Sequence, residues 1–302
     1  MAFAELFEDL GYSAKILVNT DDPYANIFDS KFVIRNWLED LNLEDQYECI
    51  VIDSYHALKL HYEKFLKFTD RLVAIDDNTR IDYPNGCIIY NGGLGGLLYN
   101  YDTSKYKKVL VGPEFALVRR QFHLHKDKKI IGEQIRKVLI SMGGSDPLNL
   151  TLRLIRIYAS KFPNFKLDII IGPGFENFPT DEFFNSDTIR FYKNLDADSM
   201  YRLMCESDLC ITAGGQTVYE LGKLGVPFIV IKTAENQLGN LLGLNRTGLV
   251  EQYIDPNGSD FEQKVESFTD NLSTKNARSL MNEKLVKVFN TDQSVIVRSV
   301  LN

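Results

Sequence analysis

The chain has 302 residues, 44% of them hydrophobic and 12% aromatic, which is enough for a substantial core and excludes a disordered protein. A formal net charge of −7 argues against nucleic-acid binding, and no apolar run reaches the roughly 18–20 residues that stable membrane insertion requires. The four cysteines lack C-x-x-C spacing, so we expect reduced cysteines, no metal site and a cytoplasmic protein.

Helical and strand patterns alternate through the first part of the chain. A helical pattern at 1–10 precedes a strand at 15–19, and a second helix is predicted at 31–41. The following apolar runs predict buried parallel strands. They lie at 49–53, 71–75 and 87–91, with a helix at 58–68 after the first. An α/β unit normally begins with a strand and a glycine-rich turn, so we expect a first strand upstream of Met1.

Polar residues follow the strands at 49–53 and 71–75, at the end where open α/β sheets place their ligand chemistry. The candidate catalytic residues there are Asp53, Tyr55 and His56. The aspartates at the two strand ends could hold a base, orient a sugar or bind a metal. Capping of the following helix is an equally good reading of each one.

The second part of the chain repeats the strand–turn–helix pattern. Strands are predicted at 137–142, 166–172 and 188–192 and on both sides of a helix at 218–225, and two or three helices are predicted after residue 260. The polar stretch at 123–129 has the composition of a linker. We therefore expect domains at 1–129 and 130–302.

Two glycine-rich turns stand out in the second domain. The segments Gly143–Pro147 (GGSDP) and Ala213–Thr217 (AGGQT) each connect a strand to a helix. Glycine lets a ligand approach the backbone closely, and a helix N-terminus favours an anion such as phosphate. Glu220 lies within reach of a ribose in such an arrangement. Neither turn is a P-loop or a GxGxxG motif, which disfavours ATPase activity and nicotinamide binding.

The motifs together resemble the UDP-2,4-diacetamido-2,4,6-trideoxy-β-L-altropyranose hydrolases of pseudaminic acid (nonulosonate) biosynthesis. The matching segments are IDSYH (52–56), AIDD (74–77), GPEFALVRRQF (112–122), LISMGGSDP (139–147), ITAGGQTVYELGKLGVPFIV (211–230) and AENQ (234–237). The family is related to spore-coat polysaccharide proteins and to MurG-type glycosyltransferases. The resemblance covers nearly the whole chain. It implies a GT-B fold, α/β, in which two Rossmann-like domains with parallel sheets face a central cleft.

The resemblance also implies which residues hold the UDP-sugar substrate, with no cofactor. The implied UDP-binding residues are Gly143, Gly144, Ser145, Asn194, Ala213, Gly214, Gly215, Thr217, Glu220, Asn236 and Gln237. The implied reaction is attack of water at the anomeric carbon with inversion, which releases UDP and the free sugar. We expect a monomer with no nucleic-acid partner.

One motif of the family is missing. The family's general base is a histidine in a Gly-x-Gly-His-x-x-Arg turn, which here would lie upstream of Met1. A displaced start site, a UDP-sugar-binding protein without catalysis, and a relocated base such as His56 or Asp53 are the three explanations. A MurG-like glycosyltransferase is the alternative enzyme.

Overall fold

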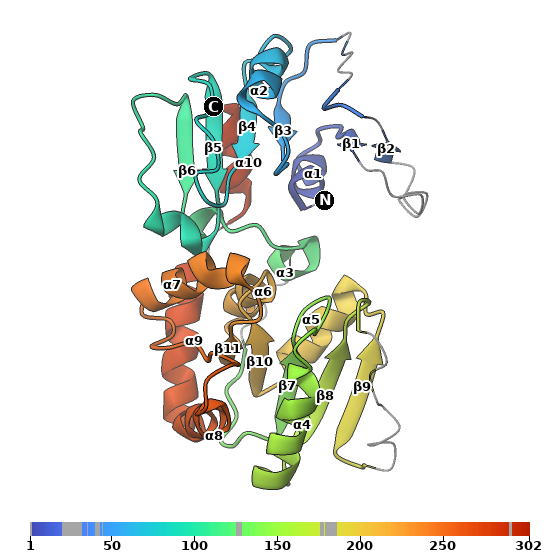
Figure 1. Cartoon of the computed structure of the whole chain (residues 1–302), viewed down its shortest axis with the longest axis vertical. Helices are drawn as coiled ribbons and strands as arrows, with labels where there is room; N and C mark the ends of the chain where they lie inside the picture. Colours follow the sequence, from blue (N-terminus) through green and yellow to red (C-terminus); the bar gives the residue numbers. More distant parts are fainter. Residues whose placement is uncertain are drawn as a thin grey trace. The chain divides into compact units, whose positions relative to one another are not determined.

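The computed structural model describes residues 2–19, 32–34, 36–39, 43, 45–124, 129–175, 178, 186–289 and 292–302. The chain divides into two units, which Figure 1 draws in one view. Unit 1 comprises Met1–Arg120 together with Thr291–Asn302, and unit 2 comprises Gln121–Asn290. These bounds differ from the predicted domains of 1–129 and 130–302, chiefly because the last helix belongs to unit 1.

Unit 1 contains two parallel sheets, of which the larger has the strand order β3-β4-β5-β6. The four strands are Ile50–Ile52, Leu72–Ile75, Cys87–Asn91 and Lys108–Val111. The smaller sheet pairs β1 (Ile16–Val18) with β2 (Phe32–Ile34). The remaining elements are α1 (Ala2–Asp9), α2 (Lys59–Phe65), η2 (Leu94–Leu98), η3 (Pro113–Phe115) and α10 (Ser294–Leu301).

The two faces of the larger sheet bury alternate residues, as the period of two in a strand requires. Val73 and Ile88 pack with α1 and α10 on one face. Their neighbours Leu72 and Cys87 pack with α2 on the other. The strands are therefore covered on both faces, which explains their continuous apolar sequences.

Unit 2 is built on one parallel sheet with the strand order β11-β10-β7-β8-β9. The strands are β7 (Lys137–Ser141), β8 (Lys166–Ile171), β9 (Ile189–Lys193), β10 (Leu209–Ala213) and β11 (Phe228–Ile231). The helices are α3 (Arg120–Leu124, at the boundary between the units), α4 (Leu150–Lys161), α5 (Ala197–Glu206), α6 (Thr217–Leu224), η5 (Glu235–Gln237), α7 (Leu238–Arg246), α8 (Phe261–Asn271) and α9 (Lys275–Phe289). Helices α4 and α8 share one core cluster with alternate residues of β7, β8 and β11. Helices α5 and α6 contact β7 and β10, and α9 packs beside α6.

The fold class predicted from the sequence, α/β with two parallel sheets, is confirmed. The helix predicted at 31–41 is wrong, because residues 32–34 form β2 and pair with β1. Its apolar run, with Val33 and Ile34, contains the β-branched residues that favour a strand.

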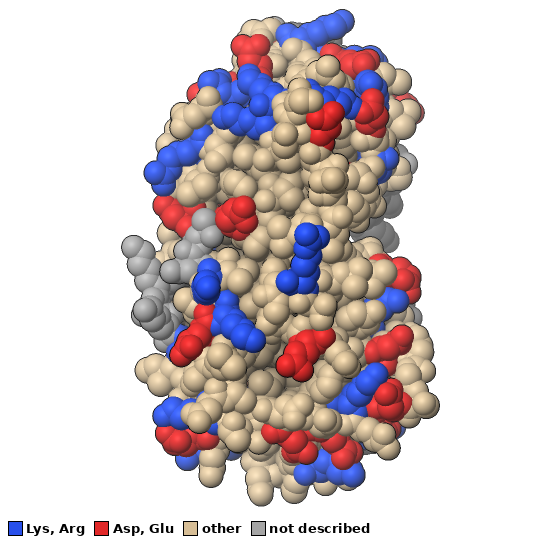
Figure 2. Space-filling model, turned by 90° about the vertical axis from the view of Figure 1, so that its left-hand side faces the viewer, with Lys and Arg blue, Asp and Glu red and all other residues tan. Residues whose placement is uncertain are grey.

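Two surface properties bear on function. On the face of the molecule in Figure 2, lysine and arginine side chains are interspersed with aspartate and glutamate. Within the described residues, no helix combines the length and the apolar character needed to cross a membrane.

Candidate functional site

The loops that follow the strands of unit 2 meet at one edge of its sheet, because all five strands run parallel. Strands β7 and β10 are direct neighbours, so the two glycine-rich turns lie next to one another at this edge. The structure brings ten predicted UDP-binding residues to the ends of β7, β9, β10 and β11. These residues are Gly143, Gly144, Ser145, Asn194, Ala213, Gly214, Gly215, Thr217, Asn236 and Gln237. Glu220 lies farther along α6.

The turn after β7 is fixed by the turn after β8. Gly143 has φ +95°, a conformation that favours glycine. A Cβ on Gly172 would lie 2.4 Å from the carbonyl oxygens of both Gly143 and Gly144, so the two turns pack backbone to backbone. The Gly174 N–H donates to the Gly144 carbonyl at 2.8 Å. This turn therefore has one fixed conformation before any ligand arrives.

A carboxylate then starts the helix that follows this turn. Asp146 accepts hydrogen bonds from the backbone N–H groups of Leu150, at 2.9 Å, and Thr151, at 2.7 Å. It thus satisfies two of the free N–H groups at the start of α4. Ser145, the preceding residue, is exposed and makes no such bond within the described residues.

The turn after β10 is held by the loop after β11. The side-chain oxygen of Gln237 accepts from the Thr233 N–H at 2.9 Å and from the Gly214 N–H at 3.3 Å. Asn240 donates to the Gly214 carbonyl at 3.3 Å. A Cβ on Gly214 would lie 2.7 Å from Leu241, so glycine is needed for packing against α7. Gln237 is therefore a connector between two loops in this structure.

At two positions on this edge, the packing of the described residues does not require glycine. A Cβ on Gly144 or on Gly215 would find no heavy atom within 4 Å, and neither residue has a positive φ. Both positions leave bare backbone facing open space. Glycine at such a position would let a ligand approach the backbone closely.

The other predicted UDP-binding residues differ in exposure. Asn194 and Asn236 are exposed, and Asn194 adopts a left-handed backbone with φ 53° at the end of β9. Thr217 is half-buried at the start of α6, whereas Glu220 is only 3% exposed in the same helix. Glu220 is thus anchored in the protein rather than extended into solvent.

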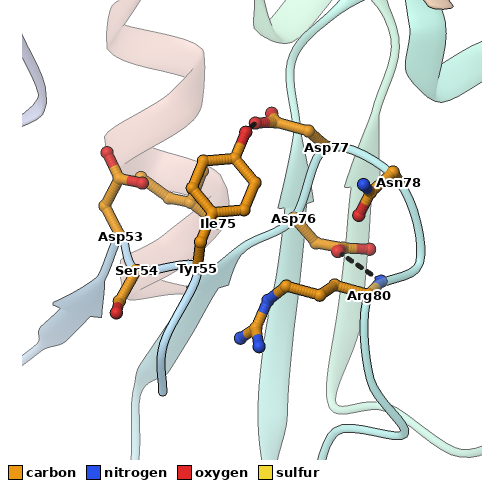
Figure 3. A pocket seen from close by; sticks show the side chains of 8 residues that line it. All are labelled: Asp53, Ser54, Tyr55, Ile75, Asp76, Asp77, Asn78 and Arg80. Atoms are coloured by element: carbon orange, nitrogen blue, oxygen red, sulfur yellow. Dashed lines mark hydrogen bonds between the residues drawn. The ribbon is translucent and has the colours of Figure 1, made fainter. Parts of the chain in front are cut away.

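Unit 1 carries a separate polar pocket at the ends of β3 and β4 (Figure 3). It is a shallow, open hollow with a cavity volume of about 10 Å³, roughly the space of one water molecule, and its lining residues are Asp53, Ser54, Tyr55, Ile75, Asp76, Asp77, Asn78 and Arg80. The sequence placed Asp53 and Tyr55 here, and both line the pocket. The third predicted catalytic residue, His56, is exposed and does not line it.

Asp76 organises the loop that forms one wall of this pocket. Its carboxylate, 2% exposed, accepts from the backbone N–H groups of Thr79 and Arg80 at 2.9 and 3.0 Å. It also accepts from the hydroxyls of Tyr83, at 3.0 Å, and Tyr101, at 2.7 Å. Four donors saturate the carboxylate, so Asp76 is a structural residue.

The electrostatics distinguish Asp53 from Tyr55. Burial of the carboxyl and the nearby Asp77 carboxylate raise the pKa of Asp53. Within the described residues, the Asp53 carboxylate has no hydrogen-bond or ion-pair partner. The Tyr55 hydroxyl donates to Asp77 at 2.7 Å, and this bond, together with burial, raises the pKa of Tyr55 to about 12. Asp53 is therefore an available proton acceptor, and Tyr55 is a neutral phenol.

Sequence reasoning missed the residues that support these loops. Gly174, Tyr219 and Asn240 contribute through contacts with distant parts of the chain, which the sequence around each residue does not indicate. No cluster of three or more His, Cys, Asp or Glu side chains that could hold a metal occurs in the described part of the chain.

No protein-family model matches the chain. The chain is 27% identical over 201 residues to an uncharacterized protein of Methanocaldococcus jannaschii, a match that covers 63% of this chain and 41% of that protein. It is 26% identical over 230 residues to the pseudaminic acid cytidylyltransferase and UDP-2,4-diacetamido-2,4,6-trideoxy-β-L-altropyranose hydrolase of Helicobacter pylori, covering 74% of this chain and 42% of the relative. The spore coat polysaccharide biosynthesis protein SpsG of Bacillus subtilis is 25% identical over 163 residues, or 52% of this chain and 46% of the relative. The matches span less than half the length of each relative.

Two solved glycosyltransferase structures show a weaker likeness. MurG of Acinetobacter baumannii matches with a TM-score of 0.48 and 16% identity over 80% of this chain and 76% of that one. The spinosyn rhamnosyltransferase SpnG matches with a TM-score of 0.45 and 16% identity over 76% of this chain and 67% of that one. TM-scores below 0.5 decide nothing about activity. The chain is a distant homologue of the Helicobacter pylori enzyme and of SpsG.

Proposed function

We propose that this protein binds a UDP-sugar through unit 2 and hydrolyses it to UDP and free sugar. The observation that carries the proposal is the pair Gly144 and Gly215. They follow neighbouring parallel strands, and nothing in the fold requires glycine at either position. The distant homology to the Helicobacter pylori protein, whose name includes a UDP-sugar hydrolase, supports this substrate class.

The diphosphate would bind across the two glycine-rich turns. Backbone N–H groups at the start of α6 and the partial positive charge of its N-terminus suit a phosphate group. The same groups would stabilise the negative charge that develops on the departing UDP, without a metal ion. Glu220, one turn into α6, would accept hydrogen bonds from the ribose hydroxyls.

The sugar would be a 2,4-diacetamido-2,4,6-trideoxyhexose, as in the name of the Helicobacter pylori relative. Water would attack the anomeric carbon on the face opposite to UDP, so that the sugar C–O bond breaks and the configuration inverts. The electron pair of that bond leaves with UDP. A general base must take the proton of the attacking water.

Asp53 is the base that we propose within the described residues. It lines a pocket, its carboxylate has no partner there, and its raised pKa makes it a stronger base than an ordinary aspartate. The Tyr55 hydroxyl, whose proton is donated to Asp77, would accept a hydrogen bond from the sugar. His56 is the competing candidate.

The test is incubation of the protein with the UDP-sugar in the absence of any acceptor. Release of free UDP, with a proton NMR spectrum of the sugar showing inversion, supports hydrolysis. Release that begins only when an acceptor sugar is added identifies a glycosyltransferase instead. Tight UDP binding with no release under either condition identifies a binding protein. Parallel assays of Asp53→Asn and His56→Gln decide which side chain is the base.

A further inference from the structure

Gly214 is held by hydrogen bonds to the peptide on each side of its Cα. The Gly214 N–H donates to the carbonyl of Ile231 at 3.2 Å and to Gln237 at 3.3 Å. The Gly214 carbonyl accepts from Asn240 at 3.3 Å, and its Cα lies against Leu241. Both polar backbone atoms of Gly214 therefore have partners in the loop after β11 or in α7.

This arrangement determines the direction of the next N–H group. In a trans peptide the carbonyl and the following N–H point in opposite directions, and no described peptide bond is cis. Because the Gly214 carbonyl points toward Asn240 on α7, the Gly215 N–H must point away from α7. Within the described residues this N–H has no hydrogen-bond partner.

Asn240 has a fixed orientation because of a tyrosine. The Tyr219 hydroxyl donates to the side-chain oxygen of Asn240 at 2.6 Å, so the amide nitrogen of Asn240 faces the Gly214 carbonyl. The Tyr219 ring is 4% exposed and packs edge-on against Phe289, with ring centroids 5.9 Å apart. The chain of contacts thus runs from a buried ring in α6, through α7, to one peptide of the glycine-rich turn.

The neighbouring turn shows the same construction. There the Gly144 carbonyl accepts from Gly174, so the Ser145 N–H points the other way, and it too has no partner in the described part of the chain. Two N–H groups, in the turns that follow adjacent strands, are thereby oriented by bonds to the carbonyl that precedes each of them.

We propose that Tyr219 and Asn240 are positioning residues that orient the Gly215 N–H toward the diphosphate of the ligand. The inference rests on the proposed function, because it names the residues that prepare that site for a nucleoside diphosphate. Neither side chain touches the phosphate in this arrangement. The two residues act by keeping the 214–215 peptide from rotating, so the donor is oriented before the ligand binds.

The experiment measures the dissociation constants of UDP, inorganic pyrophosphate and uridine by calorimetry for four proteins. The variants are Asn240→Ala, Tyr219→Phe and Asn245→Ala, compared with the wild type. Asn245 is the matched control, because it is an amide in the same helix whose side chain bonds to the Glu251 carbonyl. Thermal unfolding of each variant shows that it is folded.

We expect Asn240→Ala to weaken UDP and pyrophosphate binding about tenfold, since a hydrogen bond to a charged group is lost or misaligned. Tyr219→Phe should weaken both about threefold, and Asn245→Ala should change neither. Uridine affinity should stay within about twofold in all variants, because the nucleoside does not use this peptide.

Three outcomes would overturn the inference. Equal losses for UDP and uridine would mean a general structural role for Asn240. Unchanged pyrophosphate affinity in Asn240→Ala would mean that the peptide needs no support. A wild type that binds neither UDP nor pyrophosphate would remove the site itself. A wild type that binds pyrophosphate but shows no preference for UDP refutes the nucleotide assignment alone, and the variants then test the positioning role on pyrophosphate.

Discussion

Replacement of Gly215 by alanine separates ligand binding from folding. The added methyl group would meet no heavy atom within 4 Å, and the residue has no positive φ. Alanine also restricts the unfolded chain, so the free energy of unfolding should stay the same or rise by about 0.4–1 kcal/mol. For a unit of this size the melting temperature should rise by no more than about 2–4 °C.

The same methyl group should obstruct UDP. It would stand where the diphosphate must approach the backbone, and a charged hydrogen bond contributes about 1.5–3 kcal/mol. We therefore expect UDP affinity to fall at least about tenfold while the protein keeps its stability. Calorimetric titration with UDP and thermal unfolding of the same preparation measure both quantities.

Two further glycines provide controls. Gly132→Ala places its Cβ 3.6 Å from the nearest atoms, away from the glycine-rich turns, so it should leave UDP affinity unchanged and affect stability in the same way as Gly215→Ala. Gly172→Ala places its Cβ 2.4 Å from backbone oxygens and should destabilise the unit by several kcal/mol. If folded Gly215→Ala binds UDP as tightly as the wild type does, the glycine-rich turn is not the phosphate site.

Three other substitutions test the remaining residues. Glu220→Ala should weaken UDP and UMP equally, by about tenfold in calorimetry, because the ribose is common to both; unchanged affinity would place the ribose elsewhere. Asp76→Ala should lower the free energy of unfolding in urea by about 3–5 kcal/mol, since it leaves two loop N–H groups and two tyrosine hydroxyls without their acceptor. Asp53→Asn should abolish hydrolysis yet stabilise the fold at neutral pH. Because the folded-state pKa of Asp53 is raised, the wild type should lose stability relative to Asp53→Asn as the pH rises above about 4, and the two should converge at lower pH. A stability difference that grows on acidification would contradict the assigned direction of the pKa shift.

Much of the fold could be predicted because its strands are buried on both faces. The run at 137–142 has three consecutive apolar residues, Val138–Ile140, and the structure places β7 at Lys137–Ser141 in the middle of the sheet. The segment at 31–41 was harder to predict. Its strand β2 is three residues long, and it is stabilised by pairing with β1, sixteen positions earlier in register. Local periodicity carries no information about such a partner.

The candidate site was predictable only where its chemistry lies in one short segment. Gly215 and Glu220 belong to a turn and helix that the sequence marks directly. Asp76 looked equivalent to Asp53, and only the hydroxyls of Tyr83 and Tyr101 show that it serves the structure. Those bonds join residues 7 and 25 positions away, so no motif could reveal them.

The position of the last helix has a consequence for how unit 1 folds. Helix α10 covers the same sheet face as α1, and its final turn is held by Arg71, which donates to the Leu301 carbonyl at 2.8 Å, and by Lys108, which donates to the Ser299 carbonyl at 2.8 Å. Unit 2 is one continuous segment between the two parts of unit 1. Unit 1 is therefore complete only when its C-terminal segment joins the N-terminal one, and a fragment that ends before Thr291 would leave part of the apolar sheet face beside α1 exposed.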